Sequence, residues 1–152
     1  HHASVQFTEK QSTELAELWV GWTKQDFEKP SDVAEWKTRE GVLRGKLTED
    51  QASRLVRKVR EDQDQNAKAM VTNLANLSKL PAERIPALEK VVLPRLTPEE
   101  NMLLPQAHPE TSLSWSRIVS LVEANLAELT VLTENELESL RKMLQVLKPM
   151  NR

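Results

Sequence analysis

Apolar residues recur at intervals of three and four along most of the chain, which is the spacing of one face of an α-helix. Leu15, Leu18 and Trp22 follow this spacing near the start, and Leu137 and Leu140 follow it near the end. The pattern predicts helices over about residues 8–27, 31–40, 48–77, 81–92, 98–104, 112–130 and 133–148. Runs of β-branched residues with period-two alternation, which would indicate strands, are absent.

Capping residues indicate where these helices begin. In a capping box, a Thr and a Glu or Gln three places later each bond the other's backbone amide. Four pairs match this pattern: Thr8 with Gln11, Thr48 with Gln51, Thr97 with Glu100, and Thr133 with Glu136. We expect Ser31 to cap the second helix, and the segment from Gly41 to Lys46 to be a loop because glycine is typical of helix ends.

Prolines divide the long helices into two groups. Six of the eight prolines lie within residues 79–111, and each disfavours a helix interior. The predicted fold is therefore all-α, an antiparallel helical bundle with a proline-rich segment of short helices between the long helices. Residues 1–4 are typical of a tag remnant, and residues 5–152 are expected to form a single helical domain.

The longest predicted helix, over 48–77, changes character in its middle. Its ends carry apolar residues at helical spacing, whereas residues 61–66 are entirely polar. A helix that is polar all round faces solvent on every side or meets a partner. We expect one of these two situations at 61–66.

Composition and charge narrow the range of functions. The 152 residues carry 21 basic and 23 acidic side chains, so the formal net charge of -2 gives no overall field that would attract nucleic acid. The chain has no cysteine, which excludes disulfides and thiolate metal sites. No apolar stretch approaches the roughly 18 residues that a membrane span requires. We therefore expect no membrane span, and the compartment stays open.

Side chains for catalysis or cofactor binding are scarce. His108 is the only histidine outside residues 1–4, and with Glu110 nearby it makes an incomplete metal site. No Gly-x-Ser-x-Gly elbow is present, and three scattered glycines cannot form a phosphate-binding loop. We interpret His108 as a loop histidine and expect no enzyme activity, no cofactor and no metal site.

The tryptophans form the most distinctive cluster in the sequence. Trp19, Trp22 and Trp36 lie within eighteen residues, and the chain has no tyrosine. One interpretation is that they are core anchors at helical spacing. The other is that part of the cluster is exposed, since tryptophan is enriched at binding hot spots.

A basic run in the third helix is the second candidate for partner binding. It is preceded by Arg39, Arg44 and Lys46 and followed at once by acidic residues, so pairs such as Arg57 with Glu61 would weaken its field. We interpret it as a charged face that can border a binding site, because interfaces favour arginine. The predicted partner-binding residues are Trp19, Trp22, Trp36, Arg54, Arg57, Lys58 and Arg60.

The segment Leu47-Thr48-Glu49-Asp50-Gln51 resembles the LTxxQ signature of small periplasmic helical stress proteins. A second segment, Leu96-Thr97-Pro98-Glu99-Glu100, is similar but ends in Glu. The resemblance implies a chaperone or a metal-stress sensor. Both segments also match ordinary capping boxes after a leucine.

These observations favour a non-catalytic helical protein–protein interaction or regulatory domain. We expect the partner to be another protein, leave a homo-oligomer open, and do not expect nucleic acid. The two alternatives are a periplasmic LTxxQ-like stress chaperone or sensor and a nucleic-acid-binding helical domain.

Overall fold

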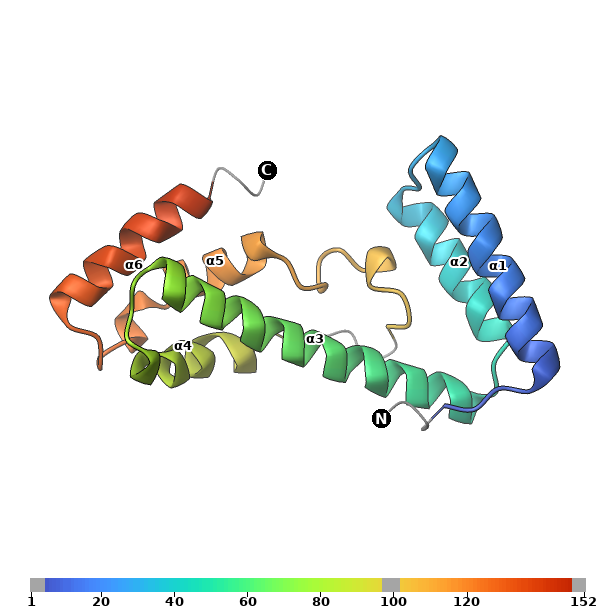
Figure 1. Ribbon diagram of the computed structural model, residues 1–152, viewed down its shortest axis with the longest axis horizontal. Coiled ribbons are helices and arrows are strands. Elements are labelled where there is room, and N and C mark those ends of the chain that lie inside the picture. Colours follow the sequence, from blue (N-terminus) through green and yellow to red (C-terminus); the bar gives the residue numbers. More distant parts are fainter. Residues whose placement is uncertain (1–4, 97–101, 149–152) are drawn as a thin grey trace. The chain divides into compact units, whose positions relative to one another are not determined.

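The protein is an all-α structure (Figure 1). The computed structural model describes residues 5–96 and 102–148; within these ranges it contains six α-helices and no strand. The predicted all-α class is confirmed, whereas the bundle arrangement of the long helices stays a prediction. The predicted tag remnant at 1–4 and the capping box of Thr97 with Glu100 lie outside the described residues. None of the described helices is both long enough and apolar enough to cross a membrane.

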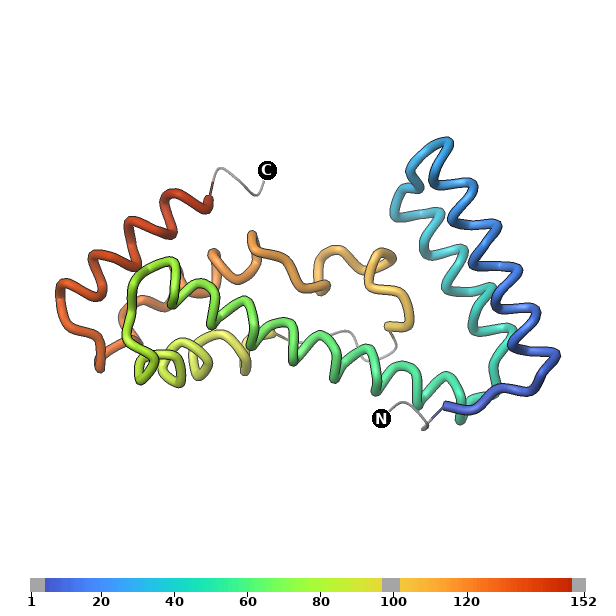
Figure 2. The backbone as a smooth tube through the Cα atoms, in the orientation of Figure 1, coloured from blue at the N-terminus to red at the C-terminus, as the bar shows by residue number. Residues whose placement is uncertain are grey.

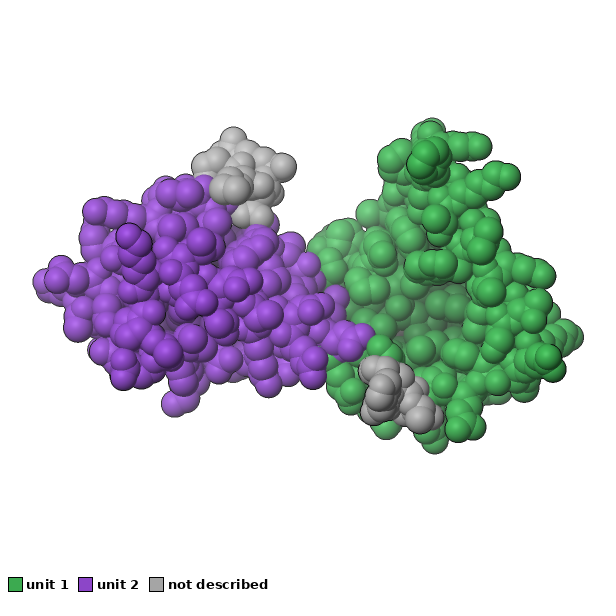
Figure 3. Space-filling model, in the orientation of Figure 1, with its two compact units in different colours: residues 1–61, 98–112 green, residues 62–97, 113–152 purple. Residues whose placement is uncertain are grey.

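The chain divides into two compact units, coloured separately in Figure 3. Unit 1 comprises residues 1–61 and 98–112, and unit 2 comprises residues 62–97 and 113–152. The single domain expected over 5–152 stays a prediction. The boundary between the two units lies inside one helix, within the polar stretch 61–66, where every side chain except the half-buried Gln63 is exposed.

Unit 1 contains α1 (Glu9–Glu28), α2 (Val33–Gly45), the first part of α3 (Glu49–Leu77) and the short helix η4 (Pro105–Ala107). Figure 2 follows the backbone along α1, through a tight connection, and back along α2 as a helical hairpin. The capping boxes predicted at the starts of α1 and α3 are both present. Their glutamines also bond each other, because Gln11 Nε2 donates to Gln51 Oε1 at 2.7 Å. The two helix starts are therefore joined through side chains.

The loop predicted from Gly41 to Lys46 is wrong, because α2 continues to Gly45. An exposed glycine costs a helix only about 1 kcal/mol relative to alanine, which the contacts of α2 outweigh. The predicted cap is also wrong: the Asp32 side chain accepts the hydrogen bond from Glu35 N, 2.9 Å away. Residues 102–104, the described end of the predicted helix 98–104, are not helical.

Unit 2 contains the rest of α3 and the helices α4 (Ile85–Val92), α5 (Trp115–Ala124) and α6 (Glu134–Leu147). Short 3-10 helices lie at Ala82–Arg84, Leu93–Arg95 and Leu126–Glu128. The helix predicted over 112–130 is shorter than expected, ending at Ala124. The core is built from the apolar faces of all four helices. Its fully buried members include Val71, Leu74, Leu88, Val92, Ile118, Val122, Leu140 and Leu144.

The two units differ in how much apolar surface they bury. The buried apolar cluster of unit 1 consists of Val56, Leu103 and Leu104, with partly buried side chains around it. Unit 2 has a much larger cluster. Because a small apolar core contributes little to stability, polar contacts are more important for stability in unit 1 than in unit 2.

Candidate interaction site

Arg39 lies at the centre of the hairpin in unit 1. Its side chain is only 1% exposed, although arginine is almost never fully buried without a partner. The guanidinium lies over two aromatic rings, with Cζ 5.5 Å from the ring centroid of Trp22 and 4.5 Å from that of Trp36. Both distances are within the range of cation–π attraction. We name Trp22 and Trp36, which both contact the charge, the aromatic cage of Arg39.

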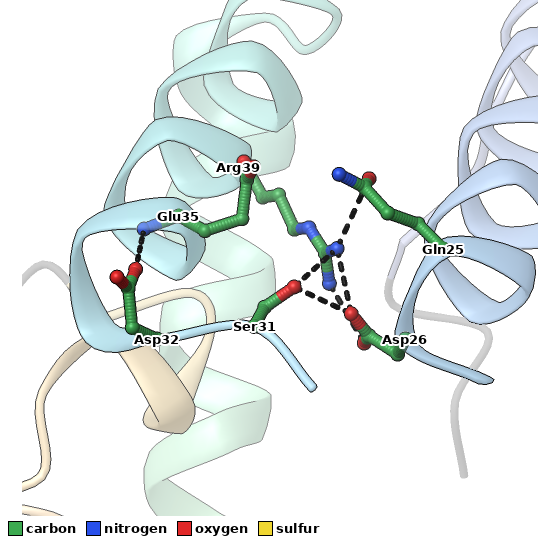
Figure 4. A network of polar contacts seen from close by, with 6 residues as sticks. All are labelled: Gln25, Asp26, Ser31, Asp32, Glu35 and Arg39. Carbon is green, nitrogen blue, oxygen red and sulfur yellow. Dashed lines mark hydrogen bonds and ion pairs between the residues drawn. The ribbon is translucent and has the colours of Figure 1, made fainter. Parts of the chain in front are cut away.

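Polar groups from α1 and the interhelical connection also bind the Arg39 guanidinium, as Figure 4 shows. Arg39 Nη1 and Nη2 donate to the two carboxylate oxygens of Asp26 at 2.9 and 2.8 Å, which is a bidentate pair. Nη2 also donates to Ser31 Oγ at 2.7 Å and to Gln25 Oε1 at 3.3 Å. Ser31, predicted as a helix cap, instead joins the ion pair and donates to Asp26.

The ion pair changes the protonation behaviour of its members. The hydrogen bonds from the Arg39 guanidinium and then from Ser31 lower the pKa of Asp26 from 3.8 to about 2. The hydrogen bond to Asp26 raises the pKa of Arg39. Both groups stay charged at neutral pH, so the pair holds α1 against α2 as a fixed clamp.

Glu40 forms a second buried polar cluster on another side of α2. Its Oε2 accepts hydrogen bonds from the backbone amides of Leu103 and Leu104, both at 2.8 Å, and its Oε1 lies 2.8 Å from His108 Nε2. Burial by itself raises the pKa of Glu40. The hydrogen bonds from Leu104, His108 and Leu103 outweigh burial, so the pKa is lowered. Glu40 therefore holds the segment around 102–108 against α2.

The solvent side of α1 carries an uncharged stripe. None of the 20 residues of α1, all of which are described, is buried. Five exposed residues follow one another at spacings of three and four, so they share one helix face. We name them the α1 seam: Thr13, Ala16, Val20, Thr23 and Phe27. Val20 is 66% exposed and Phe27 is 93% exposed.

Trp19 borders the α1 seam. It is 54% exposed, and its ring meets that of Trp22 edge to face at a centroid distance of 6.3 Å. Trp19 thus connects the aromatic cage of Arg39 to the exposed stripe. Large exposed apolar side chains that lie together mark binding surfaces more often than isolated ones do.

The structure separates the three predicted tryptophans. Trp22 and Trp36 are half-buried around Arg39, whereas Trp19 is exposed. The interpretation of the whole cluster as core anchors is therefore wrong for Trp19. Its predicted role in partner binding stays a prediction.

The predicted basic residues lie on α3, apart from the tryptophans in sequence and partly engaged already. Arg54 Nε pairs with Asp50 Oδ2 at 2.9 Å, and Lys58 and Arg60 also have interaction partners. The expected pair of Arg57 with Glu61 is not formed among the described residues.

A shallow hollow in unit 1 brings basic side chains from two helices together. It is lined by Arg44, Arg57 and Arg60 and also by the carboxylates of Glu49 and Asp50. Nη2 of Arg44 is buried there without a hydrogen-bond partner among the described residues. The hollow has mixed charge, with the basic groups in slight excess.

No grouping of three or more His, Asp or Glu side chains that could hold a metal ion occurs in the described part of the chain. His108, interpreted from sequence as a loop histidine, does lie in a loop after η4. Its side chain is only 13% exposed because it contacts Glu40. The contact between His108 and Glu40 helps to hold the segment around 102–108 against α2, and this structural role accounts for the position of His108.

Comparisons with known protein families, with curated proteins and with solved structures found no match. In the segment that resembles the LTxxQ signature, Thr48 and Gln51 cap α3, and Gln51 Nε2 also donates to the backbone of Gln6 at 2.8 Å. Local capping thus accounts for these two residues.

Sequence reasoning missed Glu40 and the roles of Asp26 and Ser31. Arg39 and Glu40 follow Trp36 by three and four residues and precede Leu43 by four and three. This spacing places both charged residues on the same face of α2 as Trp36 and Leu43, and from it their burial could have been predicted. Their partners are 13 and 63 residues away in sequence, and no local pattern indicates such pairings.

Proposed function

We propose that the protein is a non-catalytic helical interaction domain that binds a protein partner, either another protein or a second copy of this chain, through the α1 seam. The observation that carries this proposal is a 20-residue helix with no buried residue and an uncharged exposed stripe that ends in the almost fully exposed Phe27. Leaving aromatic and β-branched side chains in water has no benefit for the isolated fold. Covering them with a partner would be favourable.

The Arg39 clamp supports this proposal because it fixes the helix that carries the seam. The bidentate pair with Asp26 and the two flanking tryptophans hold α1 on α2 without using the exposed face of α1. A binding surface that is already ordered loses less conformational entropy on association. Trp19, at the edge of the seam, is of the residue type most enriched at hot spots.

Photo-crosslinking from the seam tests this function. The photoreactive amino acid benzoylphenylalanine replaces Phe27 in the full chain, expressed in its source cells, and Gln145 on the exposed side of α6 serves as the matched control. We expect a discrete crosslinked protein band from position 27 and none from position 145. Equal crosslinking from both positions, or none from position 27, would contradict the proposal.

The nucleic-acid alternative is supported by one observation, the hollow lined by Arg44, Arg57 and Arg60. Neighbouring carboxylates reduce its positive charge, so any binding should be weak and should fall steeply with salt. Titration of a fluorescent single-stranded oligonucleotide at two salt concentrations tests it. Tight binding at physiological salt that Arg57→Glu abolishes would favour this alternative over a protein partner.

A further inference from the structure

We infer that the occupant of the α1 seam is a second copy of this chain, with the two α1 helices paired antiparallel. The inference rests on the proposed function, because it names the partner of the same surface. The spacing of the seam alternates between three and four residues from Thr13 to Phe27, which is the spacing of a coiled-coil contact. A helix face with this spacing packs against another helix face that has the same spacing.

The side-chain sizes along the seam are complementary to the same seam reversed. When Ala16 of one copy faces Phe27 of the second copy, Val20 faces Thr23 in the next layer, and each pairing occurs twice. The largest side chain of the seam then lies against the smallest. A large residue opposite a small one is the arrangement that fills space between two helices without voids.

The charges beside the seam select this same arrangement. Glu17 and Lys24 are seven residues apart on one flank of the seam; both are exposed, and neither makes an ion pair with another described residue. In antiparallel helix pairs, residues on the same flank meet one another. Glu17 of each copy therefore meets Lys24 of the other, which gives two reciprocal opposite-charge contacts.

The charges on the same flank disfavour the antiparallel register that is shifted by seven residues. A shift of seven residues would bring Lys10 of one copy to Lys24 of the other and would place the two Glu17 side chains together. Like charges placed together across an interface are destabilising. A parallel pair would not bring Glu17 and Lys24 together at all. The antiparallel register with Ala16 facing Phe27 is the one that satisfies both size and charge.

Charge exchange at Glu17 and Lys24 tests the inference. Because one helix pair is a small interface, we expect the unmodified chain to dimerise with a dissociation constant of about 1–100 µM in sedimentation equilibrium. Glu17→Lys places two lysine pairs in contact, and Lys24→Glu places two glutamate pairs in contact. Each single variant should weaken dimerisation by about tenfold or more. The double variant E17K/K24E restores opposite charges and should dimerise like the unmodified chain.

Mixing the two single variants gives the sharpest result. In a mixed dimer, the two lysines on the flank of the E17K chain meet the two glutamates on the flank of the K24E chain. Equimolar E17K and K24E should therefore form heterodimers, although each variant alone is mainly monomeric. Glu138→Lys and Lys142→Glu on α6, both at exposed positions, are the matched controls and should leave dimerisation unchanged. Unchanged melting curves for all variants at concentrations well below the dissociation constant would show that folding of the single chain is not affected.

Cysteine crosslinking tests the helix orientation, and the absence of cysteine from the chain makes it direct. A mixture of V20C and T23C should form an intermolecular disulfide under mild oxidation. V20C alone should not, because the Cα atoms at position 20 of the two copies would be separated beyond the roughly 7 Å that a disulfide spans. Efficient crosslinking of V20C alone would indicate a parallel pair and overturn the inference.

The outcomes separate this inference from the proposed function. A chain that stays monomeric at millimolar concentration, or charge variants that dimerise equally with no rescue on mixing, would overturn the second copy as partner. If position 27 then still crosslinks to a different protein, the proposed function stands. If position 27 crosslinks to nothing, both fail.

Discussion

Arg39 and Glu40 are consecutive residues of α2, yet their charged groups bond to different parts of unit 1. The Arg39 guanidinium donates two hydrogen bonds to the carboxylate of Asp26 in α1, with N···O distances of 2.8 and 2.9 Å. The Glu40 carboxylate instead accepts hydrogen bonds from the backbone amides of Leu103 and Leu104. Neighbouring positions of a helix point about 100° apart, so one pair of residues can hold two separate segments. These contacts leave the outer face of α1 uncovered.

Glu40→Gln should destabilise the protein. The amide of glutamine lacks the charge that strengthens the bonds from Leu103 and Leu104, and one of its two terminal atoms is a donor. We expect the free energy of unfolding to fall by about 2 kcal/mol, measured by urea denaturation. Glu28→Gln, at an exposed position on α1, is the control and should have almost no effect. Equal effects of the two variants would refute the role of Glu40.

Acid should weaken the Arg39 clamp. The pKa of Asp26 is lowered from 3.8 to about 2, so the folded chain binds fewer protons than the unfolded chain between these values. The free energy of unfolding must then fall as the pH falls from about 4 to about 2. Asp26→Asn removes this contribution. The melting temperatures of the unmodified chain and the variant should converge on acidification, and a constant difference from about pH 5 to about pH 2 would rule this out.

Trp36 and Trp19 of the hairpin should respond differently to replacement by alanine. Trp36→Ala removes a half-buried ring that stacks on Arg39, and we expect a loss of about 2–3 kcal/mol. Trp19→Ala should lower stability by no more than about 1 kcal/mol, because the exposed side chain loses mainly its edge-to-face contact with Trp22. Trp19→Ala should also remove the fluorescence component that iodide quenches most strongly. A strongly destabilised Trp19→Ala variant would contradict the placement of Trp19.

Gly41→Ala should stabilise unit 1. Gly41 lies inside α2, and an added Cβ would meet no atom within 4 Å. Alanine is favoured over glycine in helix interiors by roughly 0.5–1 kcal/mol, and we expect a gain of this size in urea denaturation. A loss of stability would mean that the α2 backbone there is not helical.

The sequence predicts helix starts well and helix contacts poorly. Thr8, Thr48 and Thr133 can be recognised as caps because a capping box is complete within four residues. The extent of α2 cannot be recognised in this way, because a glycine inside a helix has a small cost that other contacts offset. Capping involves residues close together in sequence, whereas the contacts that offset the cost of a glycine in a helix involve residues far apart in sequence.

The candidate site shows the same limit. The sequence indicates the tryptophans as unusual but not that two of them enclose Arg39 while Trp19 stays exposed. The exposed seam could not be separated from the inward face of α1, because both faces carry apolar residues at helical spacing. Which face is covered depends on residues far away in the chain.

The central claim is that the α1 seam binds a protein partner, and matched valines test it most directly. Val20 in the seam and Val146 on α6 are 66% and 57% exposed, so Val20→Asp and Val146→Asp make the same chemical change at similarly exposed helix positions. The measurement is the yield of crosslinked product from benzoylphenylalanine at position 27 in each background. We predict that Val20→Asp lowers the yield by about tenfold or more without lowering the melting temperature, since a loss of about 1.4 kcal/mol of binding free energy is a factor of about ten. Val146→Asp should leave the yield unchanged, and equal yields in the two backgrounds would contradict the claim.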